Sequence, residues 1–304
     1  MDILNQIKNL KYADTFKNIE KIKKGWSADE KYIIYTSNNK KLLLRISHIS
    51  KVEAKKKEAN IVSLIGQVCN NTPDFLDLKI YDSKVFQLYT YIEGQDASEV
   101  IRCYTKDQQF RLGVEAGNTL RKIHEIPIDK NPDFNIKEKK KIVDRIHRYK
   151  NSKYYEKKDE KAIKYIMDNL YLIDSAKVAL CHGDYHLGNM IVNGDKIFII
   201  DFNRFDYEDI YREFVPMCVF TREDSREFAI GQIQGYFNRN VPEDFWKRVK
   251  LYLAYTSLYS VLWAEPYSNE EVEGMIERKN MIYDDFNFFI LEEPKWYNNN
   301  ILDS

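Results

Sequence analysis

The side chains with the most chemical potential lie close together in one short, otherwise apolar segment of the chain, LCHGDYHLGNMIV. This segment contains His182, Asp184, His186 and Asn189, and a second apolar run that follows it ends at Asp201. Imidazoles and carboxylates bind zinc, a positioned carboxylate accepts protons, and buried polar groups hold loops together through hydrogen bonds. The pattern therefore leaves three hypotheses: a metal hydrolase, a phosphoryl-transfer loop or a structural polar cluster.

The zinc hypothesis rests on the alternation of His182, Asp184 and His186. A local strand would place these three side chains on one face, but Gly183 and Gly188 indicate a loop. A catalytic zinc normally needs three protein ligands around one point, and short His/Asp patterns arise often by chance. Bound zinc would support a hydrolase, but the sequence favours it less than phosphoryl transfer.

The spacing of three side chains favours the phosphoryl-transfer hypothesis. Asp184 precedes Asn189 by five residues, the turn-like NGD at 193–195 separates two short apolar runs, and Asp201 ends the second run before Phe202. Protein kinases have the same order and interval in the loop H-R-D-x-x-x-x-N and the D-F-G that follows it. This agreement in order and spacing argues against a purely structural cluster.

Each residue type suits this reaction. An alcohol that attacks a γ-phosphoryl group needs an acceptor for its proton and a fixed line of approach, and Asp184 on a rigid loop can supply both. Magnesium prefers hard oxygen ligands, and a β-turn would bring the Asn189 amide oxygen and the Asp201 carboxylate side by side. His182 would then tie the loop backbone to the core, whereas His186 has no predicted role.

Two regions of different periodicity must position these residues. Strand-like runs at 31–36 and 41–47 precede an amphipathic helix at 53–68 and a strand pair at 79–92. Because side chains alternate along a strand, Leu44 and Arg45 face opposite ways. From about residue 97 helical spacing dominates, apart from 180–203. The sequence therefore predicts an α+β protein with two lobes: residues 1–93, an antiparallel sheet plus a helix, and residues 94–304, mainly helical.

The segments HGDYHLGN and IIDF resemble those of the aminoglycoside phosphotransferase family, the small-molecule relatives of the protein kinases. Weaker similarity extends over most of the chain. The resemblance implies a two-lobed protein-kinase-like fold, ATP or GTP as the phosphate donor, Mg²⁺ as the cofactor and a hydroxyl of a small molecule as the acceptor. It makes Asp184 the catalytic aspartate and assigns Asn189 and Asp201 as the metal ligands.

The resemblance also predicts residues that bind the donor phosphates. In LLLRIS, Arg45 stands where the family has a phosphate-binding lysine, and its permanent charge and several donors suit the α- and β-phosphates. Glu58 is the expected partner of this cation, with Glu53 as a rival. Ser27 and backbone N–H groups of the glycine-poor segment GWSADEKYIIY would also meet the phosphates.

The purine would bind where the two lobes join. LYTYIEG resembles the family's hinge, so the backbone of Thr90, Tyr91 and Ile92 is expected to hydrogen-bond the base. Side chains contribute little to such contacts, which leaves the choice between ATP and GTP open.

The acceptor is expected to be small and cationic. No activation segment ending in A-P-E follows the metal strand, and DFNRFDYEDIYREF is expected to lead directly into helices. Residues 184–304 contain 12 Lys and Arg against 22 Asp and Glu, a net charge of −10. Carboxylates there would bind ammonium groups through charge-assisted hydrogen bonds, although a single acidic side chain is usually just solvated. The candidate acceptor residues are Asp206, Asp209, Glu213, Trp263 and Glu265, of which Asp209 is also a candidate brace for the catalytic loop.

Composition excludes other classes of function. The 47 basic and 47 acidic residues balance, so a bulk electrostatic attraction to nucleic acid is absent. No apolar run is long enough to span a bilayer, and the N-terminal residues lack the apolar stretch of a signal peptide. Four widely spaced cysteines are typical of reduced thiols. We expect a cytoplasmic protein that contacts neither nucleic acid nor membrane. The sequence does not determine the oligomeric state, for which we favour a monomer.

These features predict a Mg²⁺-dependent O-phosphotransferase for small molecules, with an aminoglycoside antibiotic as the preferred acceptor and antibiotic resistance as its consequence. A macrolide, which would need a broad apolar groove, a choline-like alcohol or a sugar remains an alternative acceptor. A nucleotide-binding pseudokinase is a further alternative, suggested by Arg45 and the glycine-poor segment. The intact set of Asp184, Asn189 and Asp201 argues against it.

Overall fold

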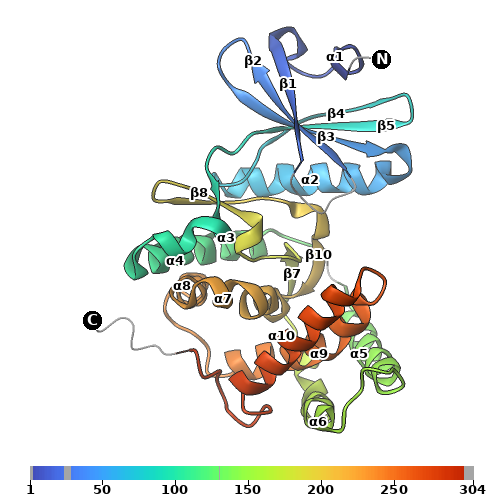
Figure 1. Ribbon diagram of the computed structural model, residues 1–304, viewed down its shortest axis with the longest axis vertical. Helices are drawn as coiled ribbons and strands as arrows, with labels where there is room; N and C mark the ends of the chain where they lie inside the picture. The colour runs from blue at the N-terminus through green and yellow to red at the C-terminus, as the bar shows by residue number, and fades with distance from the viewer. Residues whose placement is uncertain (1–2, 24–28, 130, 298–304) are drawn as a thin grey trace.

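The computed structural model describes residues 3–23, 29–129 and 131–297, which form an α+β protein with two lobes (Figure 1). The N-terminal lobe is a five-stranded antiparallel sheet in the order β1-β2-β3-β5-β4, with the long helix α2 between this sheet and the second lobe. Its elements are α1 (Ile3–Gln6), η1 (Ala13–Thr15), β1 (Phe16–Ile22), β2 (Glu30–Thr36), β3 (Lys41–His48), η2 (Ile49–Lys51), α2 (Val52–Val68), β4 (Phe75–Tyr81) and β5 (Lys84–Thr90).

The two faces of this sheet have different roles. Leu44 of β3 belongs to a small apolar core on the outer face, together with Ile34 of β2 and Ile7 from the N-terminal segment. Arg45, the next residue of β3, points the other way and contacts Glu58 of α2. The predicted alternation along β3 is therefore confirmed, and Arg45 lies on the face of the sheet that is directed toward α2.

The C-terminal lobe is mainly helical and contains the larger apolar core. Within the described residues, no helix combines the length and apolarity needed to cross a membrane. Its elements are β6 (Gln95–Asp96), α3 (Ala97–Val100), η3 (Ile101–Cys103), α4 (Lys106–His124), α5 (Phe134–Lys150), η4 (Lys157–Asp159), α6 (Glu160–Asn169), η5 (Leu170–Ser175), β7 (Val178–Cys181), η6 (Leu187–Asn189), β8 (Met190–Asn193), β9 (Lys196–Ile199), η7 (Phe202–Arg204), β10 (Asp206–Asp209), η8 (Ile210–Phe214), η9, a π-helix (Met217–Thr221), α7 (Arg222–Asp224), α8 (Arg226–Tyr236), α9 (Phe245–Ala264) and α10 (Asn269–Asp285).

Helices α4 and α8 form a closely packed pair, here called the floor of the C-terminal lobe, because their backbones contact each other directly. A Cβ atom added at Gly117 of α4 would lie 2.1 Å from the Gln232 carbonyl oxygen of α8, and one at Gly235 of α8 would lie 2.2 Å from the Val114 carbonyl oxygen. Only glycine permits this approach. Tyr185, next to the expected catalytic aspartate, donates its hydroxyl to the Ala116 carbonyl of α4 at 2.7 Å. The floor thus anchors the segment that follows β7.

Two short antiparallel pairs frame this segment. The predicted hairpin around NGD is present as β8 and β9, in which Met190 pairs with Ile199. The expectation that the chain after Asp201 leads directly into helices is wrong, because β10 follows and pairs with β7, Asp206 opposite Cys181. A four-residue strand rich in aspartate and glutamate has neither the length nor the β-propensity that sequence patterns detect.

Candidate active site

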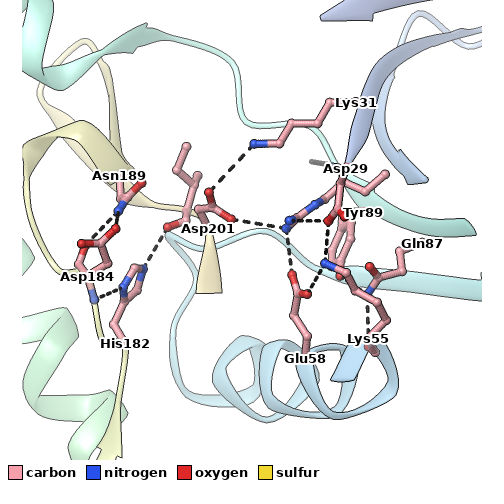
Figure 2. A network of polar contacts seen from close by, with 12 residues as sticks. Asp29, Lys31, Lys55, Glu58, Gln87, Tyr89, His182, Asp184, Asn189 and Asp201 are labelled. Carbon is pink, nitrogen blue, oxygen red and sulfur yellow. Dashed lines mark hydrogen bonds and ion pairs between the residues drawn. The ribbon is translucent and has the colours of Figure 1, made fainter. Parts of the chain in front are cut away.

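The residues that follow β7 are fixed through their backbone and through one imidazole. Buried Glu213 accepts hydrogen bonds from the N–H groups of His182 and Gly183, the latter at 3.0 Å. The His182 ring accepts from the Asp184 N–H at Nδ1 (3.2 Å) and donates from Nε2 to the Ile200 carbonyl at 2.9 Å (Figure 2). Both ring nitrogens are engaged, so His182 braces the loop and has no nitrogen left for a zinc ion.

Asp184 is partly buried and is oriented by Asn189. The Asn189 amide nitrogen donates to the Asp184 backbone oxygen at 2.9 Å and to its carboxylate Oδ2 at 3.0 Å (Figure 2). The interaction uses the nitrogen of the amide, so its oxygen is left for a cation. The catalytic candidate and one candidate metal ligand therefore form a single hydrogen-bonded unit, as their spacing of five residues predicts.

His186, for which the sequence offered no role, lies beside Asp184. Its Nδ1 accepts from the Gly188 N–H at 3.1 Å, and its Nε2 lies 3.5 Å from Asp184 Oδ1. Burial opposes ionisation of Asp184, but His186, Arg204 at 3.5 Å and Asn189 outweigh it and lower the pKa of the carboxyl group. Asp184 is therefore an anion throughout the neutral pH range, the state that a proton acceptor needs.

Asp201 is brought to the same place by the β8–β9 hairpin. It follows β9 by two residues, and the Ile200 N–H donates to the Asn189 carbonyl at 3.0 Å, which joins the two segments. Asp201 has φ +65°, a left-handed conformation that is uncommon outside glycine and that occurs at functional sites. The carboxylate of Asp201 and the amide oxygen of Asn189 are the hard oxygen donors that a divalent cation such as Mg²⁺ requires. The donor set therefore fits a metal ion.

Gly183 offers a test of this loop geometry. A Cβ there would lie 2.2 Å from the Arg204 carbonyl oxygen, and φ is +82°. Gly194 in the β8–β9 turn also has positive φ (+63°), but, apart from its two chain neighbours, no residue has an atom within 4 Å of its added Cβ. We expect Gly194→Ala to cost about 1 kcal/mol of stability with normal turnover. We expect Gly183→Ala to displace the loop from η7 and to lower kcat sharply, as measured by steady-state kinetics. Equal kcat in both variants would contradict this geometry.

A closed network of charges links the sheet, α2 and Asp201 (Figure 2). Arg45 Nη1 donates to Glu58 Oε1 at 2.7 Å and approaches Asp201 Oδ1 at 3.4 Å, and its Nη2 donates to Asp29 Oδ2 at 3.1 Å. Lys55 Nζ lies 2.6 Å from Asp29 and 2.8 Å from Glu58. The structure thus places Glu58, and not Glu53, beside Arg45. Lys55 and Asp29 are members that sequence reasoning missed.

Mutual neutralisation makes this buried network possible. Burial raises the free energy of an ionised Asp29, but its hydrogen bond to Lys55 and the charges of Lys55 and Arg45 outweigh that cost and lower the pKa of the carboxyl group well below its ordinary value. Burial likewise disfavours the Arg45 cation, and the carboxylates of Glu58 and Asp201 reverse this effect and raise the pKa of Arg45. Each ion is stable only because its counter-ions are present.

Comparison with known proteins decides the family. A family model described as the phosphotransferase enzyme family matches residues 18–252, a span that includes Arg45, Asp184, Asn189 and Asp201. The chain belongs to this phosphotransferase family. It is therefore an enzyme that transfers a phosphoryl group.

Solved structures share the fold of this phosphotransferase. A choline/ethanolamine kinase family protein from Mesorhizobium loti has a TM-score of 0.69 at 14% identity, covering 95% of this chain and 96% of that one. The amicoumacin kinase hAmiN, in complex with AMP-PNP, Ca²⁺ and Ami, has 0.66 at 14%, covering 93% and 92%. The streptomycin–ATP–APH(2″)-IIa ternary complex has 0.64 at 17%, covering 92% and 95%. At such identities the similarity shows the protein-kinase-like fold, and no curated protein sequence matches.

The predicted donor site of the phosphotransferase is only partly described. Ser27 lies outside the described residues. Thr90 ends β5, and its N–H and hydroxyl contact the backbone of Asp74. Tyr91 and Ile92 follow as a partly buried, non-helical connection to β6. For Ile92, no backbone hydrogen bond to another described residue is found, so its N–H and C=O can meet a purine.

Two of the predicted acceptor residues are structural. Asp209 is buried and accepts hydrogen bonds from the Tyr252 hydroxyl at 2.9 Å and the Tyr211 N–H. Glu213 is buried beneath the catalytic loop, where it holds two backbone N–H groups of that loop. Neither carboxylate faces solvent, so the expectation that they bind the acceptor is wrong for this structure. Asp209 and Glu213 instead stabilise the end of β10 and the loop after β7.

The other three acceptor candidates are exposed. Asp206 is the first residue of β10 and pairs with Cys181, the last residue of β7. The loop that contains Asp184 begins directly after Cys181. Trp263 is 40% exposed near the end of α9 and packs against Tyr267, with ring centroids 4.8 Å apart. Glu265 follows directly and forms a 3.2 Å ion pair with exposed Lys153. These side chains are available to a solute.

One further group in the described residues has metal-ligand character. His124, Cys181 and Glu213 bring one ligand atom each within 4.8 Å of one another. Burial, followed by the charges of Glu213 and Glu208, raises the pKa of the Cys181 thiol well above its ordinary value, so it stays protonated. Because Glu213 is already engaged by the loop backbone, this group supports the loop and gives no support to the zinc-hydrolase hypothesis.

Proposed function

We propose that this phosphotransferase moves the γ-phosphoryl group of ATP or GTP to a hydroxyl group of a small molecule in a Mg²⁺-dependent reaction. The observation that carries the proposal is the unit of Asp184 and Asn189, joined through the β8–β9 hairpin to Asp201. It combines an ionised proton acceptor with two oxygen donors for a cation, and these are the parts that phosphoryl transfer needs.

The reaction follows from these positions. The acceptor hydroxyl gives its proton to the Asp184 carboxylate while its oxygen forms a bond to the γ-phosphorus and the bond from that phosphorus to the β–γ bridging oxygen breaks. The products are a phosphate monoester and a nucleoside diphosphate. Asn189 and Asp201 would hold the metal, which when bound neutralises charge on the phosphates. The braces from His182 and Glu213 keep Asp184 at a fixed position, which gives the approach its direction.

An aminoglycoside is the acceptor that we propose first. Exposed Asp206 and Glu265 offer carboxylates to ammonium groups, and exposed Trp263 offers an aromatic face for cations or sugar rings. Such an activity would make the enzyme an antibiotic-resistance kinase. The four cysteines are free thiols, three of them buried, which supports a reducing, cytoplasmic location.

The experiment that tests this proposal is a coupled nucleotide-turnover screen. ATP and GTP are each offered with aminoglycosides, macrolides, choline-like amino alcohols and sugars, in the presence of Mg²⁺. The proposal predicts acceptor-dependent turnover, strongest with an aminoglycoside. Turnover with another class would keep the reaction and replace the acceptor. Nucleotide binding without turnover by any acceptor would indicate a pseudokinase.

The acceptor site yields a separate prediction. Asp206→Asn and Glu265→Gln remove charge without changing size, so we expect a higher KM for a cationic acceptor at unchanged kcat, because the contact is made equally in the ground and transition states. Glu243→Gln, an exposed position near the other end of α9, is the matched control and should behave like the wild type. An unchanged acceptor KM in both test variants would remove these residues from the acceptor site.

A further inference from the structure

Lys31 of β2 lies directly opposite Arg45 in the register of β2 and β3. Side chains opposite each other on antiparallel strands share one face of the sheet, so two cations lie side by side on the face directed toward Asp201. Such like-charged pairs destabilise a sheet unless anions lie near them. Figure 2 shows Lys31 directed toward Asp201. The distance between Lys31 Nζ and Asp201 Oδ2 is 3.9 Å.

The terminal nitrogens of Arg45 are already committed to protein carboxylates. They contact Glu58, Asp29 and Asp201, while the Nε lies buried without a hydrogen-bond partner among the described residues, and only 6% of the side chain is exposed. Because the guanidinium is planar, it cannot turn one nitrogen toward a phosphate and keep the others in place. A shift toward a ligand would leave Glu58 paired with Lys55, and Asp29 paired with Lys55 and the exposed Lys51. Such a loss of pairing inside a protein is strongly unfavourable.

Lys31 has the opposite character. Its side chain is 21% exposed, and the 3.9 Å approach to Asp201 is too long for a hydrogen bond. No shorter hydrogen bond or ion pair of the Lys31 ammonium group with another described residue is found. An ammonium group on a flexible stem carries three donors that can follow a phosphate. Lys31 therefore presents an uncommitted cation next to the carboxylate expected to hold the metal.

We propose that Lys31, rather than Arg45, makes the cationic contact to the phosphates of the nucleotide. This inference rests on the proposed nucleotide-dependent function and deepens it. The ligand is a nucleoside triphosphate with its divalent cation: Lys31 would contact the phosphates, and Asp201 would help to hold the cation. Arg45 is then a positioning residue that joins β3 to Glu58 of α2 and to Asp29, the residue before β2.

The assignment explains the absence of lysine at position 45. A lysine is present one strand away, at the position that pairs with residue 45 and on the same face of the sheet. The arginine that occupies position 45 has enough donors to join three carboxylates, which a single ammonium group could do only with poorer geometry. The structural and phosphate-binding roles are thus divided between two residues.

Calorimetry would measure the dissociation constants of adenosine and of AMP-PNP, the latter with Mg²⁺. If the wild type prefers guanine nucleotides, guanosine and GMP-PNP take the place of these two ligands. A charge-assisted contact to phosphate corresponds to about 10- to 100-fold in affinity. Lys31→Met is therefore expected to weaken AMP-PNP binding by that factor, to leave adenosine binding unchanged and to leave the melting temperature unchanged. Lys31→Arg should recover most of the affinity.

Lys84→Met is the matched control, because Lys84 of β5 is exposed and makes a similarly long 4.0 Å contact with Glu30. It should bind both ligands like the wild type. Unchanged AMP-PNP affinity in Lys31→Met, or equal weakening for adenosine and AMP-PNP, would overturn the assignment of Lys31 while leaving the proposed function intact. Failure of the wild type to bind either triphosphate analogue would instead overturn the proposed function together with this inference.

Discussion

Replacing Asp184 with asparagine is expected to lower kcat by about 10²- to 10⁴-fold, the usual contribution of a positioned general base. The substitution keeps the size of the side chain and one acceptor oxygen for the Asn189 amide, but removes the negative charge that accepts the proton. The lowered pKa of Asp184 means that the wild-type carboxylate is ionised at neutral pH. Steady-state kinetics with the acceptor found by the screen, together with calorimetry of nucleotide binding, would measure the two effects separately.

The control for this variant is Asp195→Asn. Asp195 is an exposed carboxylate in the turn of the same β8–β9 hairpin, between Asn189 and Asp201 in sequence. It should retain wild-type kcat. Nucleotide affinity should be retained in both variants, because Asp184 acts on the acceptor. Substantial turnover by Asp184→Asn would show that another group takes the proton and would contradict the proposed mechanism.

Glu58→Ala is expected to lower the free energy of unfolding by about 3 to 5 kcal/mol, the cost of leaving buried charge uncompensated. Glu58 accepts from both Arg45 and Lys55, and these three side chains are each less than 8% exposed. Loss of the Glu58 carboxylate leaves the buried cations Arg45 and Lys55 with Asp29 and the more distant Asp201 as counter-ions. Urea denaturation followed by circular dichroism would measure the change.

Glu53→Ala provides the comparison on the same helix. Glu53 is exposed and pairs with exposed Lys56 at 2.8 Å, so solvent screens the interaction and no measurable loss of stability is expected. Similar losses of stability in the two variants would mean that helix propensity, and not the buried network, stabilises α2. A stable Glu58→Ala variant would contradict the closed charge network between Arg45, Lys55 and Asp29.

Local patterns in the sequence predicted those parts of the fold that depend on short-range periodicity. Three such features depend only on residues close by in the sequence. They are the apolar face of α2, the alternation of Leu44 and Arg45, and the hairpin between Asn189 and Asp201. The spacing of Asp184 and Asn189 likewise reflects a hydrogen bond within one loop. Such features survive in almost any tertiary context.

Long-range contacts account for what sequence reasoning missed. Glu213 stands among several acidic residues and looks like a surface carboxylate, yet it supports the backbone of Gly183, 30 residues earlier. Lys31 acquires significance only from a strand register that places it beside Arg45 and from a hairpin that brings Asp201 to it. Neither the composition nor the period of the flanking residues contains this information.

The measurement that tests the proposed function most directly is detection of a phosphorylated acceptor by mass spectrometry. The purified enzyme is incubated with Mg²⁺, ATP or GTP and the small alcohols of the screen, beside Asp184→Asn. We predict an acceptor that gains one phosphoryl group in a reaction that needs the metal, and loss of this product in Asp184→Asn. Formation of free phosphate alone, or a phosphorylated acceptor at undiminished rate in Asp184→Asn, would contradict phosphoryl transfer by this site.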